Sequence, residues 1–161
     1  MFYIASTRFN HATWNENTEY RRQHSFRAIY GVCIKMHEKY PLKSIIFVIE
    51  MNNDNNQICG IGLIRNSLSL DKKYKIYADH DYNRFIYKGD FWISRGEILD
   101  YDATLIVRLE NILFKGKGHL KRQSGISVIT NKPFLNWNYN EAEIKESIKN
   151  LFVLKFKPHT S

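Results

Sequence analysis

The chain has 161 residues, of which 43% are hydrophobic and 14% aromatic, and its formal net charge is +8. This composition is typical of a folded domain and excludes a disordered chain. Two cysteines are too few for a disulfide framework, and the longest apolar run, Ile45–Ile49, is far too short to span a membrane. We therefore expect a single domain over residues 1–161, intracellular (cytoplasmic or nuclear) because the first residues do not resemble a signal peptide.

The first half of the chain predicts strands and one helix. Before residue 44 we expect a strand over Phe2–Ser6, a helix over residues 15–24 capped by Asn15, and a strand near residues 28–34. The clearest element is a hairpin, because the apolar runs Ile45–Ile49 and Ile58–Ile64 flank the turn-forming sequence NNDNN. Gly60 and Gly62 interrupt the second run, which indicates a bulge, a bend or a close backbone approach.

The second half predicts further short strands and two helices. Three aromatic pieces have strand character: Tyr74–Tyr77, Arg84–Tyr87 and Phe91–Ser94. Helical spacing of apolar residues predicts a helix over residues 102–113 with Asp102 as N-cap, and a later one that begins after Asn140. The sequence GISVIT predicts one more strand, and LFVLKF fits either a last strand or a helical continuation.

These elements together predict an α+β domain. About six short strands would form a small curved sheet or β-barrel, with two or three helices packed outside. Residues 131–161 would either belong to that unit or form an appended C-terminal helix or strand.

A basic segment follows the predicted helix over residues 102–113. Between Asn111 and Asn140 there is no acidic residue, whereas the stretch Leu113–Ser127 contains the cations Lys115, Lys117, Lys121 and Arg122, together with His119. Cations that follow a backbone and glycines that allow close approach suit single-stranded nucleic acid, so we expect this segment to contact phosphates. A solvated loop is the alternative.

Aromatic side chains near the middle of the chain are candidates for stacking on bases. Trp92 is the first candidate, with core packing as its alternative. Tyr82, Asn83 and Arg84 lie at a predicted turn, where Asn83 could bond a base edge and Arg84 a phosphate. Alternatively, Asn83 bonds only its own backbone, as asparagine often does in turns.

The order of several motifs resembles the PUA-like superfamily, especially its YTH and EVE branches. These motifs are FYIAST, then IYGV after a helix, then IIFVIEMN and CGIGLI around a polar turn, and finally GDFWIS and LFKGKGHL. The resemblance covers about residues 2–130. It implies a small β-barrel wrapped by helices, and recognition of nucleic acid through one flipped-out base, often a modified one, in an aromatic cage.

The resemblance also implies ligand contacts near the first strand. The sequence differs from the family at one wall of the aromatic cage. Ser6, Thr7, Asn10 and Trp14 lie where the family places ligand-contacting residues, although N-capping is an equal alternative. Cys33 follows YGV at the position where the YTH branch has a cage tryptophan, so that wall is missing. The family specificity for methylated adenine is therefore not predicted.

Catalytic and metal-binding motifs do not occur in this sequence. There is no H-x-x-H, C-x-x-C, Walker or G-x-S-x-G pattern, so we expect neither a metal nor a cofactor. The leading prediction is a module that binds nucleic acid, single-stranded RNA above all. One alternative is a metal-independent ribonuclease of the ASCH type, with His119 acting beside a lysine and a tyrosine. The other is a viral or regulatory protein-interaction module with a basic docking face.

Overall fold

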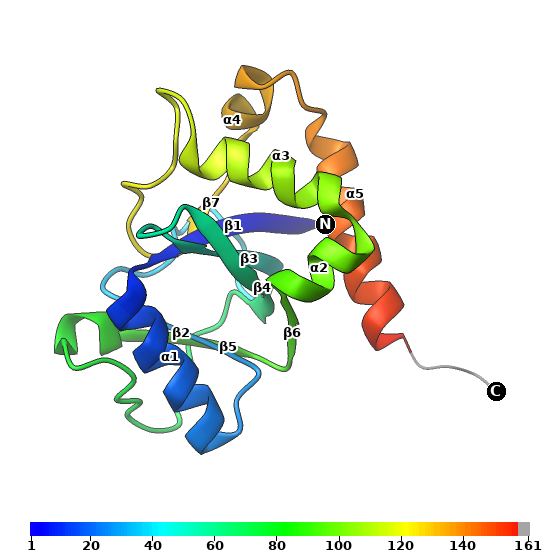
Figure 1. Cartoon of the computed structure of the whole chain (residues 1–161). Coiled ribbons are helices and arrows are strands. Elements are labelled where there is room, and N and C mark those ends of the chain that lie inside the picture. The colour runs from blue at the N-terminus through cyan, green and yellow to red at the C-terminus, as the bar shows by residue number, and fades with distance from the viewer. Residues whose placement is uncertain (158–161) are drawn as a thin grey trace.

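The computed structural model describes residues 1–157 (Figure 1). Its strands are β1 (Phe2–Phe9), β2 (Ala28–Val32), β3 (Ile45–Asn52), β4 (Gln57–Arg65), β5 (Phe85–Gly89), β6 (Phe91–Ser94) and β7 (Ser127–Val128). Its helices are α1 (His11–His24), α2 (Arg95–Tyr101), α3 (Ala103–Phe114), α4 (Asn131–Asn136) and α5 (Glu141–Phe156), with a 3₁₀ turn, η1 (His80–Asn83).

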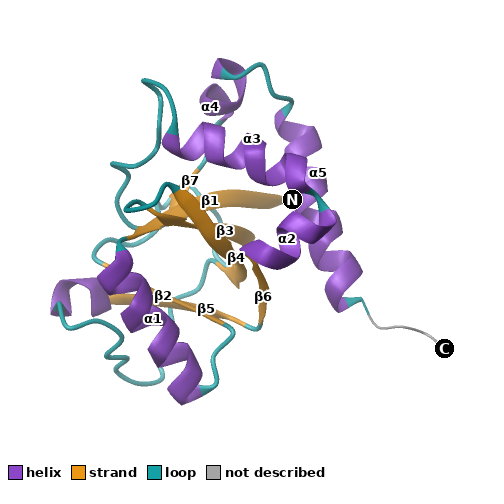
Figure 2. Cartoon of the chain, in the orientation of Figure 1, coloured by secondary structure: helices purple, strands orange, loops and turns teal. Residues whose placement is uncertain are grey.

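The strands form two separate sheets (Figure 2). Five of them form a mixed sheet in the order β6-β4-β3-β1-β7, in which only β1 and β3 are parallel neighbours. The other two, β2 and β5, form an antiparallel ribbon. The predicted α+β class is confirmed. Within the described residues the strands do not close into a barrel, so the predicted barrel is not confirmed.

Both faces of the five-stranded sheet are covered. Helices α2 to α5 lie against one face, and α1 lies with the β2–β5 ribbon on the other (Figure 1). Successive residues of a strand point to opposite faces, so Ile4 of β1 joins the helical cluster while Ala5 joins the cluster beside the ribbon. The central strand β3 is buried from Ile46 to Asn52, which explains its continuous apolar run.

Three predictions from local sequence signals are confirmed. The hairpin of β3 and β4 is antiparallel, with Ile46 opposite Ile64. Asp102 and Asn140 are N-caps: the side chain of each accepts a hydrogen bond, 3.1 Å long, from the backbone amide three residues further on. Polar caps before apolar-periodic stretches therefore located α3 and α5 correctly.

The first helix begins earlier than predicted. Asn10, and not Asn15, is its N-cap: the Asn10 side chain accepts from the Thr13 amide at 2.8 Å, and the Thr13 hydroxyl accepts from the Asn10 amide at 3.0 Å. This reciprocal pair is a capping box, which fixes the start of a helix more firmly than one asparagine does.

The strand predicted over Tyr74–Tyr77 is wrong. The side chain of Asn83 accepts hydrogen bonds from the amides of Ile76 and Tyr77, at 3.1 and 2.9 Å, and donates one to the Tyr77 carbonyl at 2.7 Å. These bonds replace the pairing that a neighbouring strand would give. The Asn83 side chain thus bonds the backbone of the segment that precedes η1, and not its own backbone as the local alternative predicted.

Residues 131–157 contain two helices, α4 and α5, of which α4 was not predicted. The sequence LFVLKF continues α5 and does not form a strand. Phe134, Ile144 and Ile148 have no exposed surface and belong to the cluster on the helical face of the sheet. Helix α2, also unpredicted, begins with a capping box of Ser94 and Glu97.

Candidate nucleic-acid interface

A cleft of about 360 Å³ opens on the ribbon side of the sheet. It lies between the end of β1, which β7 leaves unpaired after Ser6, and the edge of β2 that faces away from β5. The start of α1, the turn between β3 and β4, and the loop after α3 complete its walls. Its volume falls in the range of about 300–1,000 Å³ that is typical of ligand sites. Of the predicted site residues, four line this cleft: Thr7, Asn10, Cys33 and Tyr82.

The backbone of β2 presents free polar groups to the cleft. The Ile29 carbonyl accepts a hydrogen bond from the Asn17 side chain at 2.8 Å, so it points away from β5. Peptide groups of alternate residues in an antiparallel strand point the same way, so those of Gly31 also face away from β5. Ile86 is paired opposite Gly31 in the ribbon, and its carbonyl accepts a hydrogen bond from the Ser69 amide at 2.8 Å, so it points away from β2. Gly31 and Ile86 are therefore a pair that exchanges no hydrogen bonds. No described residue is hydrogen-bonded to the Gly31 peptide groups.

Thr7 and Tyr82 add side-chain groups to this edge. Thr7 is only 6% exposed and lines the cleft, yet within residues 1–157 its hydroxyl has no hydrogen-bond partner. Tyr82 is 40% exposed, and its ring contacts Tyr77 edge-on with 6.2 Å between centroids. Asn53, which also lines the cleft, has a buried Oδ1 without a hydrogen-bond partner among residues 1–157, so this cleft is suited to a polar ligand with a flat, stackable part.

The end of the basic segment forms part of one wall of the cleft. Ser124 and Gly125 line it, and Gly125 has a left-handed backbone (φ +69°) in close contact with Ile34. The Lys121 carbonyl accepts hydrogen bonds from Arg8 at 3.2 Å and from the Asn53 side chain at 2.9 Å. The loop is therefore tied to β1 and to the β3–β4 turn.

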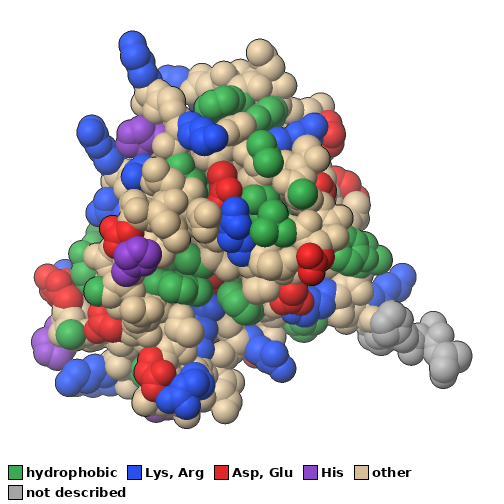
Figure 3. Space-filling view, in the orientation of Figure 1, with side chains coloured by type: hydrophobic (Ala, Val, Ile, Leu, Met, Phe, Trp, Pro, Cys, Tyr) green, Lys and Arg blue, Asp and Glu red, His purple; other side chains and the backbone are tan. Residues whose placement is uncertain are grey.

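The cations of this loop point into solvent. Figure 3 shows Lys and Arg side chains projecting at upper left, where the segment after α3 lies in Figure 1. Lys115, Lys117 and Arg122 are exposed, and Lys121 is half-buried. None of these four side chains is hydrogen-bonded or ion-paired to a residue in the described part of the chain. They remain available to an anionic ligand.

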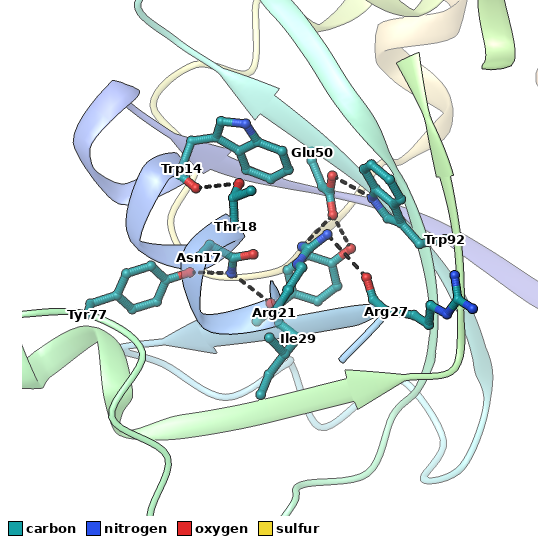
Figure 4. A network of polar contacts seen from close by, with 10 residues as sticks. Trp14, Asn17, Thr18, Arg21, Arg27, Ile29, Glu50, Tyr77 and Trp92 are labelled. Atoms are coloured by element: carbon teal, nitrogen blue, oxygen red, sulfur yellow. Dashed lines mark hydrogen bonds and ion pairs between the residues drawn. The ribbon is translucent and has the colours of Figure 1, made fainter. Parts of the chain in front are cut away.

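Trp92 does not line the cleft but belongs to a buried polar network (Figure 4). At its centre is Glu50, which has no exposed surface. Its carboxylate accepts hydrogen bonds from Arg21 at 2.8 Å, from the Tyr30 hydroxyl at 2.6 Å and from the Trp92 indole at 2.9 Å. Trp92 thereby joins β6 to the charge on β3. We did not foresee this network, because one glutamate in an apolar strand gives no sign of its partners.

Three aromatic rings surround the guanidinium of Arg21. The rings are those of Trp14, Tyr30 and Trp92, whose centroids lie 5.3, 5.5 and 5.6 Å from its central carbon. Cations are attracted to aromatic faces at such distances. Trp14 therefore packs in this network and, like Trp92, does not line the cleft.

Burial and charge shift the pKa values of groups in and near this network. Burial, the largest single influence, would lower the pKa of Arg21. The charge and hydrogen bond of Glu50, together with Tyr30 and Tyr77, nevertheless raise that pKa above its usual value. Burial, followed by the charge of Glu50, raises the pKa of Tyr30 well above its usual value and that of the Cys59 thiol to about 12. Arg21 therefore stays charged and Tyr30 stays protonated at neutral pH.

The two glycines of β4, for which a bulge, a bend or a close backbone approach was predicted, make room for two of these rings. A Cβ atom at Gly60 would lie 2.8 Å from the Trp92 ring, and one at Gly62 would lie 2.1 Å from the Tyr30 hydroxyl. The hairpin register also shifts beside Glu50, so a bulge accompanies the buried carboxylate.

The remaining predicted residues are spread over the surface. Arg84 is exposed beyond η1, and Ser6 borders a second cleft on the other face of β1. Nδ1 of His119 accepts a hydrogen bond from the Lys121 amide at 3.3 Å. Among residues 1–157, no titratable side chain is hydrogen-bonded or ion-paired to His119, so no observation favours the ribonuclease alternative. Gly31, Arg8 and Asn53 line the cleft without having been predicted.

Comparisons with family models, with curated proteins and with solved structures find no match for this chain. The resemblance to the PUA-like superfamily therefore stays a prediction. Within residues 1–157, no three metal-binding side chains gather into one group. No helix in the same part of the chain has the length and apolar character needed to cross a membrane.

Proposed function

We propose that this chain binds single-stranded nucleic acid, RNA in preference to DNA, with one base in the 360 Å³ cleft and the adjoining phosphates on the basic loop. The observation that carries the proposal is that a cleft with free hydrogen-bonding groups adjoins a loop rich in cations. The unpaired β2 edge and the Thr7 hydroxyl supply hydrogen-bonding groups inside the cleft, and the loop that forms its wall carries four cations without partners in the described part of the chain.

An unpaired base fits this arrangement better than a duplex does. Bases in a duplex have their edges occupied by pairing, whereas a splayed base can enter a cleft and bond peptide groups there. Tyr82 offers a ring at the cleft, and stacking of one base on an aromatic ring contributes about 1–3 kcal/mol. In this proposal Tyr82 takes the stacking role that the sequence assigned to Trp92.

The first test measures binding of labelled single-stranded RNA by fluorescence anisotropy over a salt series. Four phosphate contacts predict a log–log salt slope of roughly −3, at ~0.7 per contact. The triple variant Lys117/Lys121/Arg122→Ala should lower the slope by about 2 and the affinity roughly 100-fold at 0.1 M salt. Parallel series with DNA and with duplex RNA test the stated preference.

A matched control removes the same charge from the other side of the molecule. The variant Lys145/Lys149/Lys157→Ala changes cations on or beside α5 and should bind RNA nearly as the wild type does, after a small loss of general attraction. Equal loss in both triple variants would contradict the site. Shortened RNA on a gel afterwards would favour the ribonuclease, and no RNA binding together with binding to an acidic protein would favour the interaction module.

Cys33 gives a second, independent test, because it lines the cleft while Cys59 does not. Thiolates react with alkylating agents and thiols do not, so the raised pKa of Cys59 makes it a slow internal reference. Bound RNA should slow alkylation of Cys33 and leave that of Cys59 unchanged. Alkylation of Cys33 at the same rate with saturating RNA would show that the ligand lies elsewhere.

A further inference from the structure

A second, smaller cleft of about 190 Å³ lies on the helical side of β1. Its walls come from β1, β7, the loop before β7 and the start of α4. Ser6 is 1% exposed there, and its hydroxyl has no hydrogen-bond partner among residues 1–157. Thr130, also in the wall, precedes α4 without a side-chain capping bond. Ser6 is almost completely buried and Thr130 is exposed, and both present hydroxyls that a polar ligand in this cleft can bond.

The two clefts are connected through one strand. Ser6 and Thr7 are neighbours in β1, so their side chains point to opposite faces of the sheet. Ser6 faces the second cleft and Thr7 the first. Each cleft is therefore lined by a hydroxyl residue of the same strand, at the same edge of the sheet.

The basic loop also borders both clefts. Gln123 lines the second cleft, and Ser124, the next residue, lines the first. Lys121 and Arg122 immediately precede them, so cations lie beside the route from one cleft to the other. A nucleic-acid strand carries one negative charge for each linkage between nucleotides, which is the charge that such a route requires.

We propose that the second cleft is a subsite for another nucleotide of the same strand, which crosses the basic loop with one base in each cleft. This inference rests on the proposed function. The walls combine hydroxyls with the apolar side chains of Leu120 and Pro133, a mixture that suits the face and the edge of a base. The strand then passes around the β7 edge of the sheet, with its phosphates on Lys121 and Arg122.

The test is a length series of single-stranded oligonucleotides, from one to eight nucleotides, measured on several variants. For the wild type, affinity should rise roughly 10-fold, the contribution of one further base, at the length that first reaches the second cleft. Thr130→Trp fills that cleft from an exposed position, and Ser6→Ala removes its hydroxyl. Both variants should lose the rise while still binding the shortest oligonucleotides as the wild type does.

Two controls separate this inference from the proposed function. Thr104→Trp, at an exposed position on α3, should leave the whole series unchanged, and thermal unfolding shows which variants are folded. Thr7→Val should weaken every length, because it alters the first cleft. If Thr7→Val weakens binding while Thr130→Trp matches the wild type at every length, the second subsite is refuted and the proposed function stands. If the wild type binds no oligonucleotide, the proposed function itself fails.

Discussion

The Glu50 network and the larger cleft lie side by side and share Tyr30, but the Glu50 carboxylate and the groups that line the cleft differ in their hydrogen bonding, although Arg21 Nε in the network is also buried without a partner among residues 1–157. In the network, a fully buried carboxylate receives three hydrogen bonds from three different elements. In the cleft, the Gly31 peptide groups and the Thr7 hydroxyl have no partner among the described residues. Hydrogen-bonded groups stabilise the fold, whereas groups without a partner can bond a ligand. We therefore expect substitutions in the network to change stability and substitutions in the cleft to change binding.

The largest expected effect is on the network. Glu50→Gln keeps the shape of the side chain but leaves the Arg21 charge buried without its partner, so it should lower the free energy of unfolding by about 3–5 kcal/mol. Urea unfolding measures this loss. Glu19→Gln, which breaks the exposed pair with Arg22, is the matched control and should change little. Equal midpoints for Glu50→Gln and the wild type would mean that the buried ion pair does not stabilise the fold.

The next effect concerns the room left for Tyr30. Gly62→Ala places a methyl group 2.1 Å from the Tyr30 hydroxyl oxygen, which is closer than the two atoms can pack. The variant should therefore lower the free energy of unfolding by about 1–3 kcal/mol through overpacking. Gly96→Ala is the control, because the nearest atom to its Cβ is 3.9 Å away and alanine favours a helix. A Gly62→Ala protein as stable as Gly96→Ala would show that the ring shifts freely.

An effect of similar size is expected in the cleft, but on binding and not on stability. Tyr82→Ala removes the partly exposed ring and should weaken RNA binding by about 1–3 kcal/mol, the value of one stacked base. Trp92→Phe removes the indole donor of the Glu50 network. It should therefore lower the urea midpoint of unfolding, while the folded variant should bind RNA with the affinity of the wild type. Anisotropy measures RNA binding and urea unfolding measures stability for both variants. Loss of RNA binding in Trp92→Phe but not in Tyr82→Ala would show that Trp92, and not Tyr82, stacks on the base.

The smallest effect is a dependence of stability on pH. The Cys59 thiol has a folded pKa of about 12 against an ordinary value of 9.0, so above pH 9 the unfolded chain releases a proton that the folded chain keeps. The free energy of unfolding should therefore fall as the pH rises from 9, by roughly 1 kcal/mol at pH 10. Urea unfolding at pH 7, 9 and 10 measures it, and Cys59→Ala should lack this component. An identical pH profile in the variant would contradict the assignment to Cys59.

The sequence predicted best those elements that depend on local signals. The hairpin follows from two apolar runs, and α3 and α5 follow from the caps Asp102 and Asn140. Prediction failed where a distant side chain decides, as in the segment before η1, whose backbone bonds the side chain of Asn83.

The candidate site shows the same division. Asn10, Cys33 and Tyr82 were predicted to contact a ligand, and they do line the cleft. Trp92 was also predicted, but the sequence could not show that a glutamate 42 residues away would need its indole as a donor. Gly31 could not be found either, because a free strand edge is a property of sheet topology and not of residue type.

The basic loop is attached to the rest of the molecule through the backbone of Lys121, so this attachment does not depend on the charge of the loop's side chains. Arg8 and Asn53 hold the loop by the main-chain carbonyl of residue 121, and this carbonyl is present whatever the side chain. The exposed side chains of Lys115, Lys117 and Arg122 can therefore be exchanged, by evolution or by design, while the loop keeps its course, whereas Gly116 (φ +76°) and the core-packed Leu120 are needed for its shape. Lysine could give way there to hydrophobic or acidic residues, and the same scaffold would then select a different class of polymer.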